Sequence, residues 1–578
     1  MKKPQENKIL PLAIENYGSD GEGVTHLPDG MACFVKGAMR GENCRVRLVK
    51  VGRSCAWGEV EEVTAPSPAR MEPDCAYYAD CGGCSLRHMT YEEELTLKKQ
   101  KVQDALQRIG GSHMAVSAIL GAKNTERYRN KVQFPVADGP RIGFYQKRTH
   151  AVTDVADCLL QPVAAANLRA AVKAWMEQYK VSSYDERAHK GLVRHVYVRT
   201  NARGESLCCL MVNGTELPHE EELVSALRRA EPGLKGVILG VNRKKTNVIL
   251  GESYRTLWGQ DVLEETLCGL DFRLSVPSFF QVNREQTEVL YAKALELANL
   301  TGIETVLDLY CGIGTISLAL AKKAKKVIGA EVVPEAIEDA KANARRNGIE
   351  NAEFFCGDAG DIAARLSADG LRPDVITVDP PRKGLAPDVV DTIVQMAPDR
   401  VVYVSCDPAT LARDVKRFDE QGYRPQTALA VDLFPRTSHI ESIVLLTRET
   451  TVHDMKLHSA PFEKVKSGEK TIELRLYDEK RRQIKEGDFI TFTNTSDGEK
   501  MRVTVKKLHR FDSFDALYKS LPLLQCGYTA DDVDNAKPSD MEAYYSAEEQ
   551  KKYGVVGIEL CRAKEATDES IVLQNKEP

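Results

Sequence analysis

The sequence predicts a multidomain α/β protein whose largest part is a mostly parallel, Rossmann-like sheet. From Glu304 onward, strand-length apolar runs alternate with helix-length segments, and a glycine turn closes the first run. Residues 8–64 instead alternate short strands with glycine turns, which is typical of a small β-barrel. The strand–helix alternation ends after Arg448, and a separate α+β unit is expected over residues 452–563. A chain of 578 residues has room for about three to five domains.

Four strand-length runs predict the N-terminal barrel. They cover residues 9–14, 31–35, 45–51 and 57–63. Turns that contain glycine separate them, and two prolines, Pro66 and Pro68, mark the linker that follows. We therefore expect the first domain to span residues 1–64.

Four cysteines after this linker have the spacing of a metal site. Cys75, Cys81 and Cys84 form a C-x5-C-x2-C loop, and Cys158 is the best candidate for a fourth ligand. Four thiolates suit either zinc or a [4Fe–4S] cluster, and the spacing alone does not separate the two. The alternative is a chance grouping of unligated cysteines. The loop lacks the C-x3-C-x2-C spacing of radical S-adenosylmethionine enzymes, so we expect a structural or RNA-contacting role.

The N-terminus and the hydropathy predict a cytoplasmic protein without a membrane partner. Residues 1–8 are polar throughout and lack the apolar core of a signal peptide. No apolar run reaches the roughly 18 residues that a membrane span needs. In the cytoplasm the 15 cysteines are expected to stay reduced or to bind metals.

A locally basic stretch, residues 121–150, is the candidate RNA surface. Its charged and aromatic side chains alternate: Lys123, Arg127, Arg129, Lys131, Arg141, Lys147 and Arg148 with Tyr128, Phe134, Phe144 and Tyr145. Positive charge combined with stacking rings is how unpaired RNA is held. A solvated strand pair with core aromatics is an equal alternative for any single residue. The net charge of −5 excludes a generally basic nucleic-acid coat, so any RNA surface is local, within a central domain at residues 65–275.

The glycine turn indicates a nucleotide-type cofactor. Residues 304–315 predict a strand, a turn with Gly312 and Gly314, and the start of a helix. The next strand ends in Glu331, where a carboxylate can accept hydrogen bonds from ribose hydroxyls. The missing third glycine disfavours a dinucleotide and suits S-adenosylmethionine, because that cofactor has no phosphate. Asp358 and Asp379 close two further strands, although an isolated Asp is most often a helix cap or turn residue.

Cys406 and Glu441 carry the chemistry in this pattern. Cys406 follows an apolar strand, and Glu441 precedes another apolar run. Ligands of open α/β sheets bind at the carboxyl ends of strands, which favours a catalytic thiol over an inert, buried one. Carbon 5 of a pyrimidine is a weak nucleophile until a thiolate adds to C6. It can then take a methyl group, and a base must remove its proton so that the thiol leaves. These residues therefore predict methyl transfer to pyrimidine C5.

Five motifs together resemble the RNA uracil-5-methyltransferase family, whose members have the class I S-adenosylmethionine-dependent fold. The motifs are residues 278–283, 308–315, 379–384, 405–408 and 439–441, within a methyltransferase domain expected at residues 276–448. The resemblance covers roughly residues 1–448. It implies that Cys406 is the nucleophile and Glu441 the proton acceptor. It also implies that S-adenosylmethionine is contacted by Gln281, Tyr310, Glu331 and Asp379.

The ribosomal-RNA branch of this family carries the cysteine spacing found here. By that resemblance the metal site is a [4Fe–4S] cluster, residues 8–64 are a TRAM domain, and the protein acts in rRNA processing. The implied substrate is 23S ribosomal RNA in a single-stranded or flipped-out form. In one departure, Asp407 stands where the family usually has Asn. An ionised carboxylate beside the nucleophile would raise the pKa of the thiol.

The last unit resembles the ASCH domain, which is associated with RNA. A strand expected over residues 453–458 and a helix over 462–468 lead into a G-x-K-x-x-E-x-R motif. Its Lys470, Glu473 and Arg475 alternate too irregularly for one strand face, so a surface ion-pair set is the alternative to a functional role. Residues 564–578 are polar, and we expect a disordered tail there.

Two other classes of function remain open from the sequence. The first is a metal-stabilised RNA-binding protein with an inactive methyltransferase fold, against which Cys406, Glu441 and the glycines argue. The second is methylation of transfer-RNA uridine, of cytosine C5 or of a nitrogen. A nitrogen acceptor needs no cysteine, whereas cytosine would need a hydrogen-bond donor to N3. Uridine C5 in ribosomal RNA is the acceptor that the motifs favour.

Overall fold

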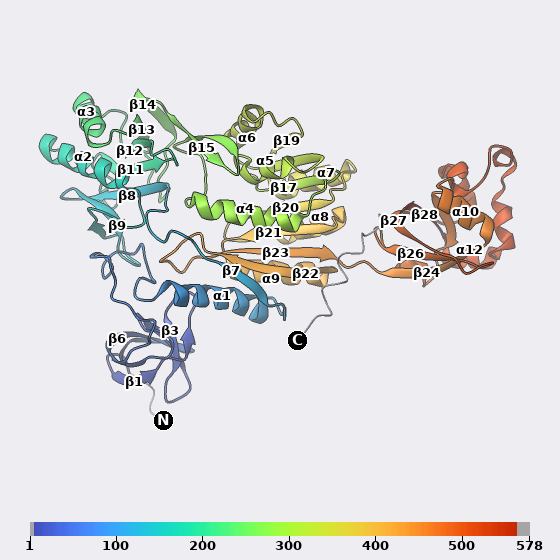
Figure 1. Cartoon of the computed structure of the whole chain (residues 1–578), viewed down its shortest axis with the longest axis horizontal. Helices are drawn as coiled ribbons and strands as arrows, with labels where there is room; N and C mark the ends of the chain where they lie inside the picture. Colours follow the sequence, from blue (N-terminus) through green and yellow to red (C-terminus); the bar gives the residue numbers. More distant parts are fainter. Residues whose placement is uncertain (1–4, 563–578) are drawn as a thin grey trace. The chain divides into compact units, whose positions relative to one another are not determined.

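The computed structural model describes residues 5–562 and divides between Thr447 and Arg448 into two compact units (Figure 1). The predicted tail, residues 564–578, lies outside the described residues. Within residues 5–562, no helix combines the length and hydropathy that crossing a membrane requires.

The first six strands form one sheet with its own core, in the order β1-β5-β6-β4-β3-β2. All four predicted strands fall on its members, and the two that the sequence did not predict, β2 and β3, are short. Buried side chains such as Val46 fill its interior, and Gly58 is required because a Cβ there would lie 2.4 Å from Val46. The bounds are β1 (Ile9–Ala13), β2 (Asn16–Tyr17), β3 (Gly23–His26), β4 (Ala32–Lys36), β5 (Asn43–Val51) and β6 (Cys55–Ala65).

The helix α1 (Tyr91–Arg108) follows the cysteine loop. Thr90 caps it, because the Thr90 side chain accepts a hydrogen bond from the Glu93 N–H. The helix packs against α9 (Pro408–Glu420). Its buried residues Val102 and Leu106 belong to the same hydrophobic core as the strands of the predicted Rossmann-like sheet. A helix from the N-terminal fifth of the chain therefore helps to build the domain that the sequence assigned to residues 276–448.

A seven-stranded sheet forms the central part of this unit, in the order β10-β9-β8-β11-β12-β13-β14. Every residue of β11 and β12 is buried, because one face packs on α2 and α3 and the other on a second cluster that includes Leu263 and Val276. The strands are β8 (Lys131–Ala137), β9 (Arg141–Tyr145), β10 (Val152–Asp154), β11 (Val193–Thr200), β12 (Ser206–Val212), β13 (Leu234–Val241) and β14 (Ser253–Gly259). The helices are α2 (Val163–Tyr179) and α3 (Glu220–Ala230).

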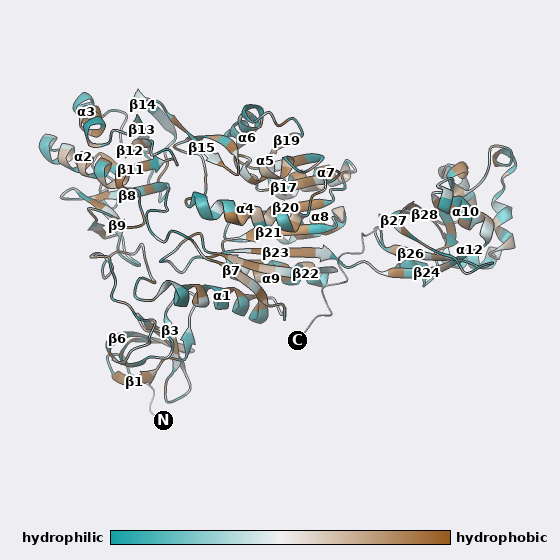
Figure 2. Ribbon diagram, in the orientation of Figure 1, coloured by the Kyte–Doolittle hydropathy of each residue, from teal (hydrophilic) through white to brown (hydrophobic). Residues whose placement is uncertain are grey.

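The predicted Rossmann-like sheet is present and has eight strands, in the order β19-β18-β17-β20-β21-β23-β22-β7. The first five strands run parallel, and β23 is antiparallel to β21. The strands are β17 (Thr305–Leu309), β18 (Lys326–Glu331), β19 (Ala352–Cys356), β20 (Val375–Val378), β21 (Arg400–Ser405), β22 (Tyr423–Val431), β23 (Glu441–Arg448) and β7 (Val116–Leu120). The edge strand β7 comes from the region before the predicted domain. Figure 2 shows hydrophobic residues along these strands.

Helices cover both faces of this sheet, and a hairpin precedes it. The helices are α4 (Arg284–Ala298), α5 (Thr315–Ala321), α6 (Pro334–Arg346), α7 (Ala359–Ala368), α8 (Pro387–Met396) and α9; the hairpin is β15 (Val262–Leu267) with β16 (Leu270–Ser275). From β17 the chain builds outward through β18 and β19, then returns to the other side with β20 and β21. The strand order therefore reverses between β17 and β20, and crevices at such points are where open α/β sheets bind ligands.

The second unit is an α+β fold around a five-stranded sheet, in the order β24-β26-β27-β28-β25. The expected strand and helix are both present, and Gly468 ends the helix in the left-handed conformation (φ +87°). The strands are β24 (Val452–Leu457), β25 (Ile472–Leu476), β26 (Phe489–Asn494), β27 (Lys500–Phe511) and β28 (Val555–Arg562). The α-helices are α10 (Ser459–Ser467), α11 (Phe514–Ser520) and α12 (Ala547–Tyr553).

Candidate active site

A cavity of about 1530 Å³ opens at the strand-order reversal of the catalytic sheet. Its walls come from the glycine turn, the segment after β20, the end of β21, the start of β23, strand β8 and the cysteine loop. It is larger than the roughly 300–1,000 Å³ of ordinary small-molecule sites. The cavity thus brings together side chains from residues 75 to 441 that are far apart in the sequence.

The pairing of β21 with β23 brings the predicted catalytic residues together. Ser405 pairs with Ser442 and Val404 with Ile443 in an antiparallel register. Cys406 directly follows Ser405, Glu441 directly precedes Ser442, and both line the cavity. Glu441 is also among the groups that raise the pKa of the Cys406 thiol. The strand pairing therefore brings a thiol and a carboxylate near each other in one cavity.

The Cys406 thiol is protonated in this environment. Burial raises its pKa to about 11, and Glu441 and Asp379 add to the rise, while Arg382 lowers it. Asp407 is not among the main groups that shift this pKa, and its predicted influence stays a prediction. Its carboxylate instead caps α9, accepting hydrogen bonds from the Ala409 and Thr410 N–H groups at 2.9 and 3.1 Å.

Two buried carboxyl groups share the cavity with the thiol. Burial raises the pKa of Glu441 well above its usual range, and Asp379 raises it further while Arg382 lowers it. Burial and the neighbouring Asp308 raise the pKa of Asp379 to about 7. Burial thus favours the protonated form of both groups, and the pKa of Asp379 lies near neutral pH. Such perturbed acids are typical of catalytic and binding sites.

The predicted cofactor loop has the backbone conformation that its glycines suggest. Tyr310, Gly312 and Gly314 adopt positive φ angles of 67°, 55° and 83°. Tyr310 and Gly312 line the cavity, whereas Gly314 is not among the lining residues and packs against Phe354, which lies 3.2 Å from where its Cβ would be. Glu331 lines the cavity and accepts hydrogen bonds from the Gly312 and Val333 N–H groups at 3.2 and 3.0 Å.

The remaining predicted cofactor contacts also face the cavity. Asp358 lines it and also caps α7, accepting a hydrogen bond from the Gly360 N–H at 2.9 Å. The helix-cap interpretation is confirmed, and the cofactor contact stays a prediction. Gln281 lines the cavity, and its backbone carbonyl accepts a hydrogen bond from Asn130 at 2.9 Å. Sequence reasoning missed Asp308 and gave no role to Arg382. Both lie inside quoted motifs, but their effect on neighbouring pKa values depends on packing.

The four predicted metal ligands line the same cavity, but a metal site is not shown. Cys75, Cys81, Cys84 and Cys158 are half-buried, and the pKa values of Cys81 and Cys158 are raised by burial and by neighbouring cysteines. The Gly83 N–H lies 3.4 Å from the Cys81 sulfur and donates a hydrogen bond to it. Over the described residues, no three His, Cys, Asp or Glu side chains gather closely enough to hold a metal ion.

Some residues of the basic stretch line the cavity, and others stabilise the surrounding fold. Arg129, Lys131 and Phe144 line the cavity, and the Lys131 ammonium lies 5.6 Å from the centre of the Phe279 ring, which is 64% exposed. Burial, Arg199 and Arg129 lower the pKa of Lys131 to about 8. Arg127 has a structural role instead, because it forms a bidentate pair with Asp157 at 2.7 and 2.6 Å.

The charged motif of the second unit is a compact, buried cluster. Glu473 is 4% exposed and pairs with both Lys470 and Arg475 at 2.8 Å. Glu473 and Arg475 are two residues apart on β25 and so share one face of the strand. Lys470 precedes the strand, so the three residues do not lie on one strand face, as predicted. The alternative of a surface ion-pair set is wrong, because Glu473 is buried.

Comparisons with known proteins agree with both units. The model of the tRNA (uracil-5-)-methyltransferase family matches residues 90–449, and the ASCH domain model matches residues 455–562. An uncharacterized RNA methyltransferase of Clostridium tetani is 44% identical over 447 residues, which cover 77% of this chain and 97% of that protein. Another, of Halalkalibacterium halodurans, is 45% identical over 446 residues, covering 76% and 97%.

A solved structure matches the first unit in fold and length. It is the tRNA (uracil-54, C5)-methyltransferase of Pyrococcus abyssi in complex with S-adenosyl-L-homocysteine. The TM-score is 0.63 and the sequence identity 27%, over 76% of this chain and 99% of that chain.

Proposed function

This chain belongs to the tRNA (uracil-5-)-methyltransferase family and is an S-adenosylmethionine-dependent RNA methyltransferase, and we propose that it methylates C5 of uridine in ribosomal RNA. The observation that carries the proposal is that the paired strands β21 and β23 bring Cys406 and Glu441 into one cavity, where Glu441 raises the pKa of the thiol. Methylation of a nitrogen would need no such thiol, and an inactive fold would need neither group.

The two residues divide the reaction between them. The Cys406 thiol gives its proton to solvent in the cavity, and the thiolate sulfur bonds to C6 of the uracil, which turns the ring into an enolate with nucleophilic C5. When bound, S-adenosylmethionine supplies the methyl group that C5 takes. Glu441 then accepts the C5 proton as the C6–S bond breaks and the thiolate leaves. Glu441 must therefore be ionised by that stage, which Arg382 favours.

The charges in the cavity fit a cationic cofactor. Asp379 and Glu441 are buried acids, and Glu331 faces the same space. The sulfonium of S-adenosylmethionine carries a positive charge that offsets such a set, while Glu331 can accept hydrogen bonds from ribose hydroxyls. Gln281, Tyr310, Gly312, Asp358 and Asp379 are the other proposed contacts, and Gly314 supports the loop from behind.

We also propose that Cys75, Cys81, Cys84 and Cys158 hold a [4Fe–4S] cluster. Support comes from their C-x5-C-x2-C spacing with a fourth thiol and from their place in the lining of one cavity. Zinc is the alternative occupant of the same four thiolates. Anaerobically purified protein should contain about four irons per chain, and stoichiometric zinc without iron would refute the cluster.

The choice of RNA is the finer part of the proposal. We expect a large folded RNA to be bound beyond the flipped base by four parts of the chain. They are the cysteine loop, the N-terminal barrel, the cavity residues Arg129 and Lys131, and the ASCH domain. Transfer RNA is the second candidate, because the similar Pyrococcus abyssi structure is that of a tRNA enzyme. Its match to 76% of this chain means that domain content alone does not separate the two substrates.

The deciding experiment compares labelled methyl transfer to 23S ribosomal RNA and to unmodified transfer RNA, with nuclease digestion and mass spectrometry of the product nucleoside. We expect 5-methyluridine in ribosomal RNA only. Labelling of transfer RNA alone would reverse the choice of substrate, and a methylated nitrogen or 5-methylcytidine would contradict the reaction.

Two variants test the mechanism in the same assay. Cys406→Ala should bind RNA and cofactor yet lower kcat by about 10⁴-fold or more, because no covalent adduct forms. Glu441→Gln should form that adduct and fail to resolve it, which leaves an RNA–protein complex that survives denaturation. Appreciable turnover by Cys406→Ala would sink the nucleophile assignment.

A further inference from the structure

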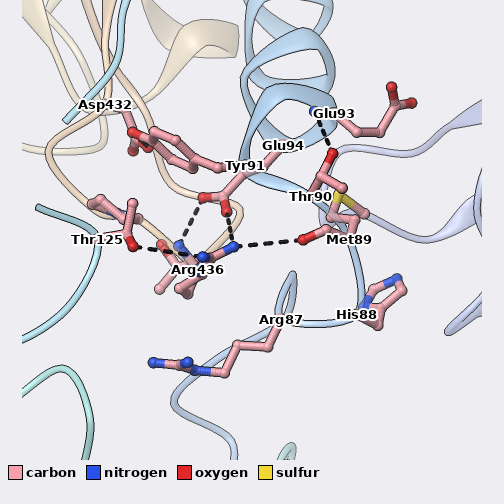
Figure 3. A network of polar contacts seen from close by, with 12 residues as sticks. Arg87, His88, Met89, Thr90, Tyr91, Glu93, Glu94, Thr125, Asp432 and Arg436 are labelled. Atoms are coloured by element: carbon pink, nitrogen blue, oxygen red, sulfur yellow. Dashed lines mark hydrogen bonds and ion pairs between the residues drawn. The ribbon is translucent and has the colours of Figure 1, made fainter. Parts of the chain in front are cut away.

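A buried polar network anchors the start of the segment that leads into Glu441 (Figure 3). Asp432, directly after β22, accepts hydrogen bonds from the Lys98 ammonium at 2.7 Å and the Tyr91 hydroxyl at 2.8 Å. Lys98 also donates to Glu94 at 2.7 Å and to the Phe434 carbonyl at 3.1 Å. The side chains of Lys98, Glu94 and Asp432 are fully buried. The network therefore ties α1 to residues 432–434.

Arg436 extends this network toward the catalytic base. Its backbone N–H donates to Glu94 at 2.7 Å, and its guanidinium lies 3.7 Å from the second Glu94 oxygen. Figure 3 shows the guanidinium between Glu94, the Met89 carbonyl and the Thr125 hydroxyl, the last two at 3.5 Å. Glu94 thus binds both the main chain and the side chain of one residue, five positions before Glu441.

The backbone of Arg436 joins the same segment to the cysteine loop. Its carbonyl accepts hydrogen bonds from the Ser85 and Leu86 N–H groups at 3.0 and 3.2 Å, directly after Cys84. Arg436 also has a φ of +70°, a left-handed conformation that is unfavourable for a side chain with a Cβ. Such a conformation persists only where the surroundings hold it, and here Glu94 and the cysteine loop do so.

From Arg436 the chain runs through a short, fully tethered turn into β23. Lys101 donates to the Ser438 carbonyl at 2.9 Å, and the His439 N–H donates to the Thr437 hydroxyl at 3.3 Å. Arg436 and Glu94 are not among the residues that line the cavity, so neither touches the reacting atoms. Their effect on the reaction must act through the residues of this segment that do line the cavity, and Glu441 is the proposed base among them.

We propose that Arg436 and Glu94 are positioning residues that hold Glu441 near Cys406 and join the cysteine loop to the catalytic base. The inference rests on the proposed function. Cys406 directly follows β21, which also pairs with β20 on its other side, whereas Glu441 directly follows this turn at the start of β23. A loosened turn should therefore slow proton removal by Glu441 more than the attack by Cys406, and the covalent adduct should accumulate.

The test uses the full-length protein with three substitutions. Arg436→Gly removes the guanidinium and suits the left-handed backbone, so it does not add strain. Arg436→Lys keeps a cation that can reach Glu94. Lys180→Gly is the matched control, because Lys180 is an exposed cation with a left-handed φ of 56° at the end of α2. The readouts are kcat, KM for RNA, cofactor affinity by calorimetry and the fraction of enzyme in a denaturation-resistant RNA complex.

Arg436→Gly should lower kcat by about 10- to 100-fold, as expected for a misplaced catalytic group. For Arg436→Gly, the KM for RNA and the cofactor affinity should stay within about twofold of wild type, and the covalent adduct should accumulate. Arg436→Lys should recover part of the lost kcat. Lys180→Gly should match wild type. A normal kcat, or a loss without adduct, would overturn the inference. If Arg436→Gly fails to fold, Glu94→Gln, which keeps an acceptor but removes the charge, serves with the same outcomes.

Glu441→Gln separates this inference from the proposed function. If that variant does not trap adduct, the proposed function itself fails. If it traps adduct and Arg436→Gly does not, only the positioning role is wrong.

Discussion

The catalytic cavity and the network around Lys98 each bury a pair of carboxyl groups, but the two pairs are compensated differently. Glu94 and Asp432 share the Lys98 ammonium at 2.7 Å each, and Arg436 stands 3.7 Å from Glu94. In the cavity, Asp379 raises the pKa of Glu441 and Arg382 only partly opposes it. Buried charges are tolerated where they are paired. Glu94 and Asp432, paired with Lys98, can stabilise the fold. Among the residues that the structure describes, Asp379 and Glu441 have no such partner, and they can interact with a cationic cofactor and accept a proton.

The ion cluster of the second unit resembles the Lys98 network, because its charges are also paired. Glu473 is buried between Lys470 and Arg475, so its charge is offset on both sides. This balance explains why a motif with catalytic residue types need not mark a reaction. Burial also raises the pKa of Glu94, but there Lys98 opposes the rise at 2.7 Å. Among these three clusters, a close cationic partner, more than the presence of Lys, Glu or Arg, distinguishes the scaffold from the candidate active site.

Replacing Lys98, the cation that Glu94 and Asp432 share, should lower the free energy of unfolding more than any other change predicted here. Lys98→Met leaves Glu94 and Asp432 buried without their common partner, and losing one member of a buried ion set costs about 3–5 kcal/mol. We expect the free energy of unfolding in urea to fall by that amount. The control is Lys341→Ala, which removes an exposed ion pair with Glu338 at 2.9 Å and should cost less than about 1 kcal/mol. Equal losses for both variants would show that the network contributes no special stability.

The unbalanced acids should make cofactor binding depend on pH. Asp379 has a folded pKa of about 7, above its usual range, so the folded protein holds that proton over pH values where the unfolded chain has lost it. Ionised Asp379 therefore costs stability, and stability should decrease as pH rises from about 4 to about 7. A cationic cofactor favours the ionised form. S-adenosylmethionine affinity should consequently increase by up to about tenfold between about pH 6 and pH 8.

Calorimetry in buffers of different ionisation enthalpy measures this linkage directly. Binding of S-adenosylmethionine should release protons near pH 6, and binding of the neutral S-adenosylhomocysteine should release fewer. Asp379→Asn should remove most of the difference between the two ligands. If both ligands show the same pH dependence in the wild-type protein, the charge of the sulfonium is not what the acids compensate.

Local motifs predicted well which residues line the cavity, because strand-end residues such as Cys406 and Glu441 follow from short apolar runs and turns. The parallel sheet and its glycine turn were predictable for the same reason. The sequence did not predict that β7 pairs with β22, or that Lys98 reaches Asp432, since each contact joins segments more than 300 residues apart. Asp308 and Arg382 were missed as modifiers of pKa because their effect depends on distance and burial in the folded state. Residues inside one motif were predictable, whereas the partners that tune or hold them were not.

Substitution of Asp407 should have the smallest effect, and it tests directly which charges set the pKa of the Cys406 thiol. Its carboxylate faces the N-terminus of α9, where it accepts two backbone hydrogen bonds. The pKa of Cys406 is raised by burial, Glu441 and Asp379 instead. Asn caps helices about as well as Asp, so Asp407→Asn should change the free energy of unfolding by less than about 0.5 kcal/mol. The pH at which alkylation of Cys406 is half-maximal should also stay within about 0.3 of wild type. Glu441→Gln should lower that pH, because it removes a charge that opposes the thiolate. A larger shift for Asp407→Asn than for Glu441→Gln would mean that the cap, and not the acids of the cavity, controls the nucleophile.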